Sequence, residues 1–201
     1  LDEFGNSGTI LAPQEYAVSG DVLQSRKEIA ASAKPNLELH YTEWSASYTP
    51  SDPVHDSYHS AAYVLQKLKQ VGNAAQSMSY WVFTDIFEES APRFTPFHGG
   101  FGLLNTQGIN KPVFYAYQFL NRLGEIELTN NDKMSWACKD LNGNIQVLAY
   151  DFTHTHPGDS VNNQEYYIRD LPSKDKGKLK VNISGVPEGN YSLEVYKVGY
   201  R

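Results

Sequence analysis

The chain has 201 residues, of which 23 are acidic and 17 basic, so its formal net charge is -6, and 40% of its residues are hydrophobic. This hydrophobic content is too high for a disordered chain and is enough to build a sizeable core. The acidic excess, spread without long charge runs, argues against a polyanion-binding surface, so we expect no nucleic-acid partner. The length exceeds one average domain but is below the roughly 250 residues of a complete eight-fold barrel, which indicates one domain plus a fragment of another.

Cysteine content and hydropathy say little about the compartment. Cys138 is the only cysteine, so no intrachain disulfide can form. No apolar run approaches the roughly 18 residues of a membrane-spanning helix, and residues 1–20 lack the pattern of a signal peptide. We therefore expect no membrane partner, and we expect any signal peptide to lie upstream of Leu1. The compartment, whether cytoplasmic or secreted, and a homo-oligomeric state stay open.

The first two-thirds of the chain alternate helix-like and strand-like segments. Asp21 is predicted to cap a helix that ends before Pro35, because proline disfavours helix for its predecessor. The residues expected on the inner side of this helix are Val22, Ile29, Ala30 and Ala33. Residues 37–42 predict a buried strand in which His40 is a packed, hydrogen-bonded core residue. Glu43 follows at the end of this strand.

A second helix is predicted over residues 57–70, with a stop at Gly72, which can adopt a left-handed C-terminal conformation. Its apolar face consists of Ala61, Val64, Leu65, Leu68 and Val71. The polar residues expected on the opposite face are Gln66, Lys67, Lys69 and Gln70.

Residues 78–83 predict a second strand, which a long loop over 84–102 follows. Pro112 lies near the first turn of a third helix, which Gly124 is expected to close. The residues expected to face inward are Val113, Ala116, Tyr117, Leu120 and Leu123. Strand, helix, strand, helix in this order predicts parallel strands with right-handed crossovers. Residues 1–124 are therefore predicted to be the end of an α/β barrel or of a doubly wound sheet.

From Glu125 the pattern changes to short strands alone, which places a domain boundary near residues 123–129. The predicted strands are 134–139, 145–152, 178–183 and 191–198. Asn142-Gly143 between the first two is a two-residue hairpin signal, because both turn positions need positive φ. Residues 125–201 are therefore predicted to be an antiparallel β-sandwich domain, incomplete at its end.

Glu43 lies where parallel-sheet and barrel enzymes place catalytic groups, at the C-terminal end of a strand. An exposed or ion-paired strand-end acid is the commoner role for such a residue. The aromatic and acidic residues that follow it at this strand end and the next are Trp44, Tyr48, Trp81, Glu88 and Glu89. Acids and aromatics at successive strand ends suit a saccharide, because carboxylates accept hydroxyl hydrogen bonds and aromatic faces cover C–H patches.

Three blocks of the sequence together resemble glycoside hydrolase family 39, especially its bacterial β-xylosidases. They are Tyr-Thr-Glu-Trp-Ser-Ala-Ser-Tyr at 41–48, Tyr-Trp-Val-Phe-Thr-Asp-Ile-Phe-Glu-Glu at 80–89, and Pro-Phe-His-Gly-Gly-Phe-Gly-Leu-Leu at 96–104. The blocks occur in the family's order with similar spacing, and their combination is specific although each block alone is weak. The resemblance is strong over 37–123 and weak in the β-domain.

By this resemblance Glu43 corresponds to the catalytic nucleophile at the end of the seventh strand of a (β/α)8 TIM barrel. Trp81, at the end of the eighth strand, resembles the aromatic wall of the xylose-binding subsite. Glu88 and Glu89 resemble the pair that hydrogen-bonds the sugar hydroxyls; without the resemblance they would be interpreted as a solvated acidic loop. His98 is expected to order the loop beside the site, with a direct sugar contact as the alternative.

The resemblance implies a retaining double displacement, in which Glu43 attacks the anomeric carbon and a second carboxylic acid protonates the leaving oxygen. In the family this second group is a glutamate that follows an asparagine at the end of the fourth strand. No Asn-Glu pair precedes Glu43, so the acid/base is expected upstream of Leu1. We expect the full-length protein to release xylose from β-1,4-xylo-oligosaccharides or xylosides, and the 201-residue chain alone to be inactive.

Two other functions stay open at this point. Within the same family pattern an α-L-iduronide is a candidate substrate, although Glu88 and Glu89 would repel the carboxylate of iduronate. A non-catalytic carbohydrate-binding module, with the function carried by residues 125–201, is the rival from another class. His154 and His156 lack further ligands at a recognised spacing and are interpreted as loop residues rather than a metal site. The expected chemistry needs neither a cofactor nor a metal.

Overall fold

The structure is a computed structural model, and it describes residues 16–47, 50–86, 93–153 and 176–199. In chain order its elements are α1 (Ser19–Ala31), β1 (His40–Trp44), the 3₁₀ helix η1 (Pro53–Asp56), α2 (Tyr58–Val71), β2 (Ser77–Tyr80), α3 (Pro112–Leu120), β3 (Ile126–Glu127), β4 (Ser135–Lys139) and β5 (Ile145–Ala149). The predicted alternation of strands and helices in the first part, and of strands alone in the second, is confirmed for these elements.

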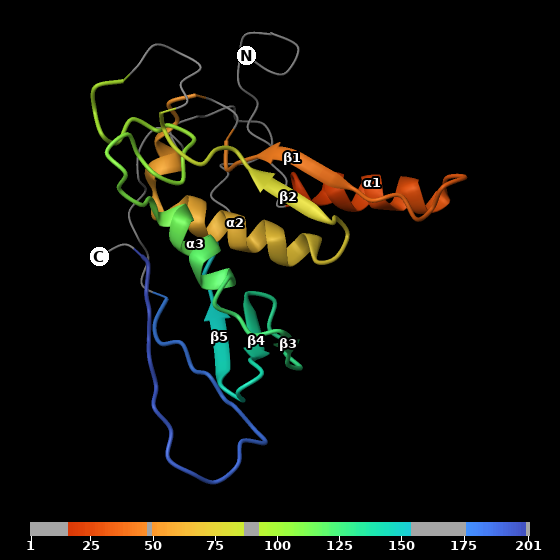
Figure 1. Ribbon diagram of the computed structural model, residues 1–201, viewed down its shortest axis with the longest axis vertical. Helices are drawn as coiled ribbons and strands as arrows, with labels where there is room; N and C mark the ends of the chain where they lie inside the picture. Colours follow the sequence, from red (N-terminus) through yellow and green to blue (C-terminus); the bar gives the residue numbers. More distant parts are fainter. Residues whose placement is uncertain (1–15, 48–49, 87–92, 154–175, 200–201) are drawn as a thin grey trace.

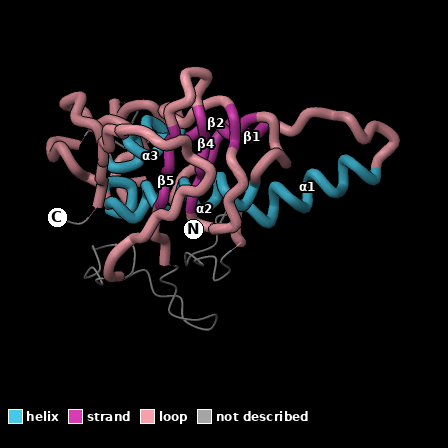
Figure 2. Tube along the Cα trace, turned by 90° about the horizontal axis from the view of Figure 1, so that it is seen from below, coloured by secondary structure: helices cyan, strands magenta, loops and turns pink. Residues whose placement is uncertain are grey.

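The strands form two separate sheets (Figure 1). β1 and β2 pair in parallel, as the order of strands and helices predicts, while β3, β4 and β5 form an antiparallel sheet in that order. Figure 1 shows α2 beneath the parallel pair and α3 leading toward the antiparallel sheet. Seen from below in Figure 2, α1 projects away from the rest of the molecule.

α2 supplies apolar surface to both sheets, as its predicted face requires. One cluster of buried residues, beneath the parallel strands, consists of Trp44, Val64 and Val113. A second cluster, toward the antiparallel sheet, consists of Ala61, Leu65, Ala116 and Leu148. The stop at Gly72 is also confirmed, because this residue ends α2 with a φ of 52°.

Lys67 on α2, which was expected on the polar face of the helix, is instead buried, with 1% of its surface exposed. Its ammonium group lies 5.2 Å from the centroid of the Tyr63 ring. A lysine can bury its aliphatic stem and still place its charge against an aromatic face, which a binary division into polar and apolar residues does not anticipate.

α1 begins three residues earlier than predicted, with Val18 as its N-cap, and Asp21 lies in its first turn instead of capping it. The Ser19 hydroxyl donates to the side-chain oxygen of Gln70 on α2 at 2.6 Å. Val22 is fully buried, whereas Ala30 and Ala33 are exposed. The expected inner side therefore covers less of the helix than predicted, because α1 docks through its first turns and then projects outward.

β1 begins at His40 rather than at residue 37, and most of its side chains are not buried as expected. His40 is hydrogen-bonded, with Nδ1 at 2.8 Å from Ser77 Oγ and Nε2 at 3.0 Å from a Glu38 carboxylate oxygen. Its side chain is nevertheless 47% exposed, so the prediction of a core histidine was wrong. Within the described part of the chain, no layer packs on this face of the strand.

Gly124 does not close α3, which ends at Leu120 with Asn121 as its C-cap. A β-carbon added to Gly124 would come within 3.0 Å of backbone atoms of Lys139 and Asp140. The glycine is required because another stretch of backbone passes close to it, and not because a helix ends there.

The hairpin of β4 and β5 forms as predicted, but its turn is longer than two residues. The last paired residues are Lys139 and Ile145, and of the predicted turn residues Gly143, with a φ of 89°, has positive φ while Asn142 does not. The Asp140 carboxylate accepts hydrogen bonds from the backbone N–H groups of Asn142 and Asn144 and from the Asn144 side chain. These bonds, the one from the Asn144 side chain above all, lower the pKa of Asp140. The aspartate thus closes a wider turn.

Two segments predicted to be strands, 178–183 and 191–198, form neither a strand nor a helix. Among the described residues no backbone hydrogen bond joins either segment to a neighbour. Their apolar side chains are exposed, for example Leu179, Leu193 and Val195. Alternating apolar residues favour a strand, yet a strand forms only where a partner supplies ladder hydrogen bonds.

Leu65 of α2 is buried in the second cluster, so a substitution there tests the packing. Leu65→Ala is expected to lower the free energy of unfolding by about 2–5 kcal/mol, because it removes buried methyl groups and leaves a cavity. Leu23→Ala on α1, where the side chain is 43% exposed, is the matched control and is expected to change stability much less. Urea unfolding of the three chains checks this, and equal losses in both variants would contradict the proposed core.

Candidate active site

A β-bulge in β1 sets the direction of Glu43. The register pairs Tyr41 with Met78 and Trp44 with Tyr80, so three steps on β1 match two steps on β2. Trp44 is buried against α2 and α3, and Tyr80 packs in the same cluster. The extra residue therefore leaves both Thr42 and Glu43 on the opposite, exposed face.

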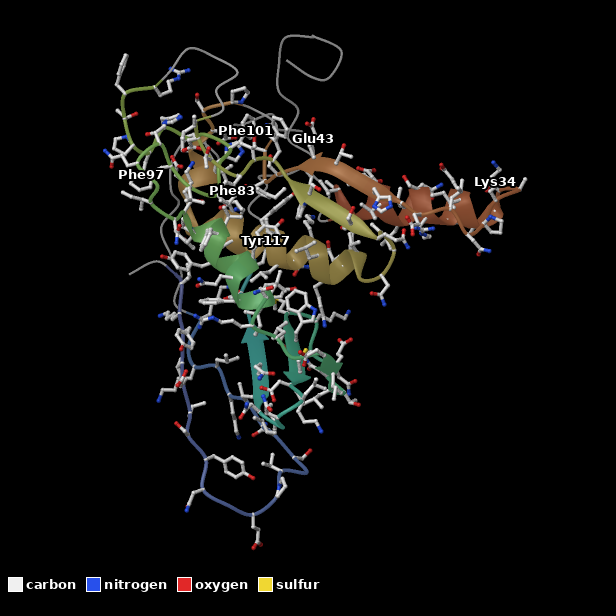
Figure 3. All side chains as sticks on the ribbon, viewed as in Figure 1. Lys34, Glu43, Phe83, Phe97, Phe101 and Tyr117 are labelled. Carbon is white, nitrogen blue, oxygen red and sulfur yellow. The ribbon has the colours of Figure 1, made fainter. Side chains whose placement is uncertain are left out.

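Figure 3 shows Glu43 near the end of β1, with its side chain pointing away from α2 and α3. Within the described part of the chain its carboxylate makes no hydrogen bond or ion pair. Because Trp44 faces the helices, the carboxylate is available on the face that would line the interior of a barrel.

Trp81 lies beside Glu43 at the same edge of the parallel sheet. Its backbone N–H donates to the Trp44 carbonyl oxygen at 2.9 Å, which continues the pairing of β2 with β1 by one residue. The peptide bond between Trp81 and Val82 is cis. The structure therefore brings two of the predicted site residues to neighbouring strand ends.

The segment after Trp81 pairs with a second segment, residues 101–104. Val82 N–H donates to the Phe101 carbonyl at 3.1 Å, and Leu103 N–H donates back to the Val82 carbonyl at 2.9 Å. Asp85 N–H donates to the Leu104 carbonyl at 2.9 Å. The predicted long loop after β2 thus contains an ordered ladder that fixes the backbone on the C-terminal side of Trp81.

A buried lysine, Lys111, lies behind this ladder and is fully enclosed. Its ammonium group lies 2.6 Å from Asp56 Oδ1 and 2.6 Å from Asp85 Oδ2, and it donates to the Gly100 carbonyl at 2.8 Å. The two carboxylate contacts are ion pairs, and the Gly100 carbonyl accepts a hydrogen bond. The charge is therefore paired and hydrogen-bonded, as burial requires.

The same two carboxylates also hold the glycine-rich loop, which we define as residues 99–102. Asp56 accepts from Gly99 N–H at 2.6 Å, and Asp85 accepts from Gly102 N–H at 2.7 Å. β-carbons added at Gly99, Gly100 or Gly102 would come within 3.0 Å of atoms of the aspartate-containing segments. The glycines permit this close approach.

His55 ties the loop after β1 to the glycine-rich loop. It is fully buried, with Nδ1 at 2.7 Å from the Gly99 carbonyl and Nε2 at 2.9 Å from the Ser47 carbonyl. Its ring also contacts the Phe101 ring, with 4.7 Å between centroids. Two loops that leave neighbouring strand ends are thereby held together.

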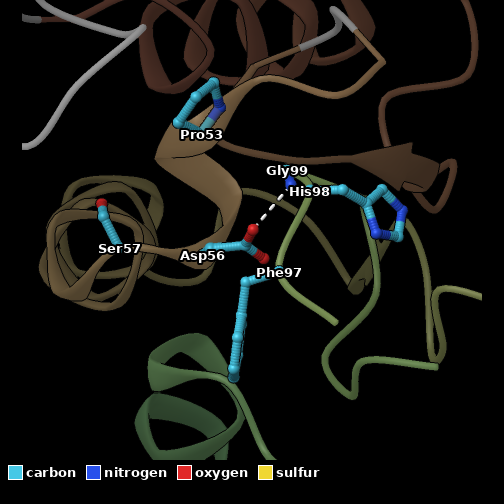
Figure 4. Close-up of a pocket in the computed structure, with 6 residues that line it drawn as sticks. All are labelled: Pro53, Asp56, Ser57, Phe97, His98 and Gly99. Carbon is cyan, nitrogen blue, oxygen red and sulfur yellow. Dashed lines mark hydrogen bonds between the residues drawn. The ribbon is translucent and has the colours of Figure 1, made fainter. Parts of the chain in front are cut away.

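His98 lies on the rim of a pocket of about 280 Å³ between η1 and residues 97–99 (Figure 4). The residues that line it are Pro53, Asp56, Ser57, Phe97, His98 and Gly99, without Glu43 or Trp81. His98 Nδ1 lies 2.9 Å from the Thr95 carbonyl, which agrees with the expected role of ordering its own loop. A direct sugar contact by His98 stays a prediction.

The other predicted site residues, Glu88 and Glu89, lie outside the described residues, as do Tyr48, His154 and His156. Residues that the sequence did not point to are His55, Asp56, Asp85 and Lys111. The spacing of Gly99, Gly100 and Gly102 was the one signal of a close backbone approach there.

In the described ranges no three His, Cys, Asp or Glu side chains gather as metal ligands. None of the described helices is long and apolar enough to cross a bilayer.

The similarity of the chain to known proteins decides its family. Residues 4–197 match the model of glycosyl hydrolases family 39. The chain belongs to this family. The family 39 chain is 40% identical over 134 residues to a beta-xylosidase of Geobacillus stearothermophilus, covering 65% of the chain and 26% of the relative. It is 41% identical over 133 residues to a beta-xylosidase of Caldicellulosiruptor saccharolyticus, covering 65% of the chain and 27% of the relative.

Solved structures agree with this assignment. The crystal structure of a monomeric beta-xylosidase from Caulobacter crescentus matches with a TM-score of 0.74 and 47% identity, covering 86% of the family 39 chain and 34% of that protein. The chain thus spans about a quarter of the length of the two sequence relatives and a third of the solved one. The predicted resemblance to family 39 is confirmed.

The close packing at Gly102 gives one test of the site. Gly102→Ala is expected to destabilise the family 39 chain by about 1–3 kcal/mol, because its β-carbon would overlap backbone atoms of Thr84, Asp85 and Leu104. Gly20→Ala is the control: it lies in α1, its β-carbon would meet only an ordinary contact at 3.6 Å from Tyr16, and it is expected to raise stability by up to about 1 kcal/mol. Thermal unfolding of both variants checks this, and a neutral Gly102→Ala would count against the described loop.

Asp52, the N-cap of η1, gives a second test through pH. Burial raises the pKa of its carboxyl, against smaller opposing effects of the Ser47 hydrogen bond, the Val54 N–H and His55. A carboxyl with a raised folded-state pKa contributes most stability below its unfolded pKa and loses that contribution as pH rises through the folded value. Asp52→Asn keeps an acceptor for Val54 N–H without the charge.

The variant is therefore expected to match the wild type near about pH 4 and to become the more stable of the two toward neutral pH. Urea midpoints measured across this pH range give the comparison. If Asp52→Asn were instead the less stable form at neutral pH, attraction to His55 would outweigh burial and the stated sign would be wrong.

Proposed function

We propose that the full-length protein is a retaining β-xylosidase, with Glu43 as its nucleophile. Its architecture would be a complete (β/α)8 barrel followed by a β-sandwich, of which residues 1–124 form the C-terminal part of the barrel and 125–201 the sandwich domain. Membership of family 39 and the beta-xylosidases among the similar proteins support this class of activity.

The observation that carries the proposal is the bulge in β1. It leaves Glu43 exposed on the face opposite Trp44, at the C-terminal end of a parallel strand. Barrel enzymes build their active sites at this end of their strands. Trp81 at the next strand end adds an aromatic surface of the kind that covers the C–H groups of a sugar.

In the proposed mechanism the ionised Glu43 attacks the anomeric carbon and forms a glycosyl-enzyme ester, while an acid protonates the leaving oxygen. Water then hydrolyses the ester, with the second carboxyl group now acting as base, so configuration is retained. The two carboxyl groups must stand about 5–5.5 Å apart. We place the acid/base outside these 201 residues, because no Asn-Glu pair precedes Glu43.

The substrate-binding part of the proposal assigns Trp81 to the wall of the xylose subsite and Glu88 and Glu89 to its hydroxyl groups. His98 would contact the sugar only if its loop turned toward Glu43, since the pocket that it lines does not include that residue. The proposed substrate is a β-1,4-xylo-oligosaccharide or an aryl xyloside.

The nucleophile assignment is tested in the full-length protein with a 2-fluoro-xyloside, which is expected to label the peptide that contains Glu43. Glu43→Ala is expected to lower kcat for an aryl β-xyloside by about 10⁴-fold or more. Azide is then expected to restore turnover and to yield the α-xylosyl azide, because it takes the place of the missing carboxylate.

The matched control is Glu38→Gln, which removes a glutamate five positions earlier whose side chain is 73% exposed. It is expected to keep wild-type kinetics. Labelling of a different carboxylate, or azide-independent activity of Glu43→Ala, would overturn the assignment. Hydrolysis of an α-L-iduronide in preference to a β-xyloside would change the proposed substrate but not the nucleophile.

A further inference from the structure

The Lys111 ammonium group connects three segments that lie apart in the sequence. Asp56 belongs to η1, which follows β1. Asp85 lies in the segment that follows β2, and Gly100 belongs to the glycine-rich loop. The backbone N–H of Lys111 also donates to the Leu103 carbonyl at 2.8 Å. One residue thus holds the loop of 99–102 and the adjoining ladder strand through both its side chain and its main chain.

Each carboxylate transmits this anchoring to the backbone. Asp85 holds Lys111 with one oxygen and Gly102 N–H with the other, and Asp56 does the same with Gly99 N–H. The Asp85 side chain is fully buried and that of Asp56 is 15% exposed, so water screens these charges little.

The ladder then reaches Trp81. Val82, Phe83 and Asp85 are bonded to residues 101–104, and Trp81 itself is bonded to β1. The indole therefore leaves a backbone that is held on its N-terminal side by β1 and on its C-terminal side by a segment that Lys111 anchors. Asp85, which pairs with Lys111, lies only four positions after Trp81, so a shift of Asp85 would displace the backbone that carries the indole.

We propose that Lys111 is a positioning residue for the sugar-binding wall, acting through Asp85, Asp56 and the glycine-rich loop on Trp81. This inference rests on the proposed function for its kinetic consequence, since it needs Trp81 to contact the sugar. Its structural content, that the Lys111 charge fixes the environment of Trp81, does not depend on the substrate.

The test must remove the ammonium group without leaving two buried carboxylates unpaired, because unpaired buried charges destabilise any fold. The variant that does so is the triple change Lys111→Met, Asp56→Asn and Asp85→Asn in the full-length protein. The asparagine oxygens can still accept from Gly99 and Gly102 N–H, so the loop keeps these two hydrogen bonds and loses the central cation with its hydrogen bond to the Gly100 carbonyl.

Two readouts apply to the folded triple variant. With an aryl β-xyloside, kcat/KM is expected to fall about 10- to 100-fold, mainly through KM, because a misplaced wall weakens binding without touching the nucleophile. By NMR, the indole N–H signal of Trp81, assigned by its loss in Trp81→Phe, is expected to shift or broaden. Trp136, which lies in β4 and is assigned in the same way with Trp136→Phe, serves as the reference signal.

Lys67→Met is the matched control, because it also removes a buried lysine ammonium but from α2, outside the anchored loop. It is expected to lower stability without raising KM and without changing the Trp81 signal. If it changed KM as much as the triple variant does, the effect would be a general consequence of lost stability and the inference would fail.

Asp85→Asn alone is the second variant, used if the triple variant does not fold, and it leaves Lys111 paired with Asp56. It is expected to give a smaller rise in KM and a smaller change in the Trp81 signal. An unchanged Trp81 signal in a folded variant would overturn the inference whatever the kinetics. If the wild-type protein did not hydrolyse xylosides, the proposed function would fail, and the Trp81 signal would still decide whether Lys111 positions this residue.

Discussion

The buried ammonium of Lys111 is the interaction on which the loops at the strand ends depend. Removing an ion from water costs several kcal/mol, and that cost is offset here by two carboxylates at 2.6 Å and a carbonyl at 2.8 Å. The second oxygen of each carboxylate accepts a glycine N–H, so both oxygens of Asp56 and of Asp85 have a partner. A buried ion pair stabilises a fold only where its contacts offset the cost of desolvation, and here the same contacts also fix the positions of three segments.

The placement of Glu43 depends on a different device, an irregularity in a short strand. In a regular strand the side chains alternate between the two faces, so Thr42 and Glu43 would point to opposite faces. The bulge instead leaves both on the exposed face. Trp44 then anchors the strand end, edge-on to the Tyr80 ring with centroids 6.1 Å apart. The burial that surrounds this aromatic cluster raises the pKa of both Tyr80 and Tyr117, so their phenols stay neutral and pack as apolar groups.

Sequence patterns predicted what depends on local periodicity. The long apolar stripe of α2, the glycine after it and the β4–β5 hairpin were predicted, and three short blocks predicted the family. The patterns missed what depends on partners distant in sequence. Nothing local to Lys111 distinguishes it from a surface lysine, the bulge leaves no mark on the residue pattern of β1, and Asp140 widened a turn that Asn142-Gly143 would have made tighter. Residues 178–183 carry the right alternation and lack a partner strand among the described residues.

The second apolar cluster joins the two parts of the chain more closely than the change of pattern near residues 123–129 implies. Leu148 of β5 shares it with Leu65 of α2, the Tyr150 hydroxyl donates to Gln66 on α2 at 3.0 Å, and the Lys69 ammonium lies 5.0 Å from the Trp136 ring centroid. Unfolding of the hairpin would expose Leu65 of α2 to solvent, and unfolding of α2 would expose Leu148 of the hairpin. The α/β part and the β4–β5 hairpin therefore share one cooperative folding unit, so that damage to the hairpin is felt at the strand ends where Glu43 and Trp81 stand.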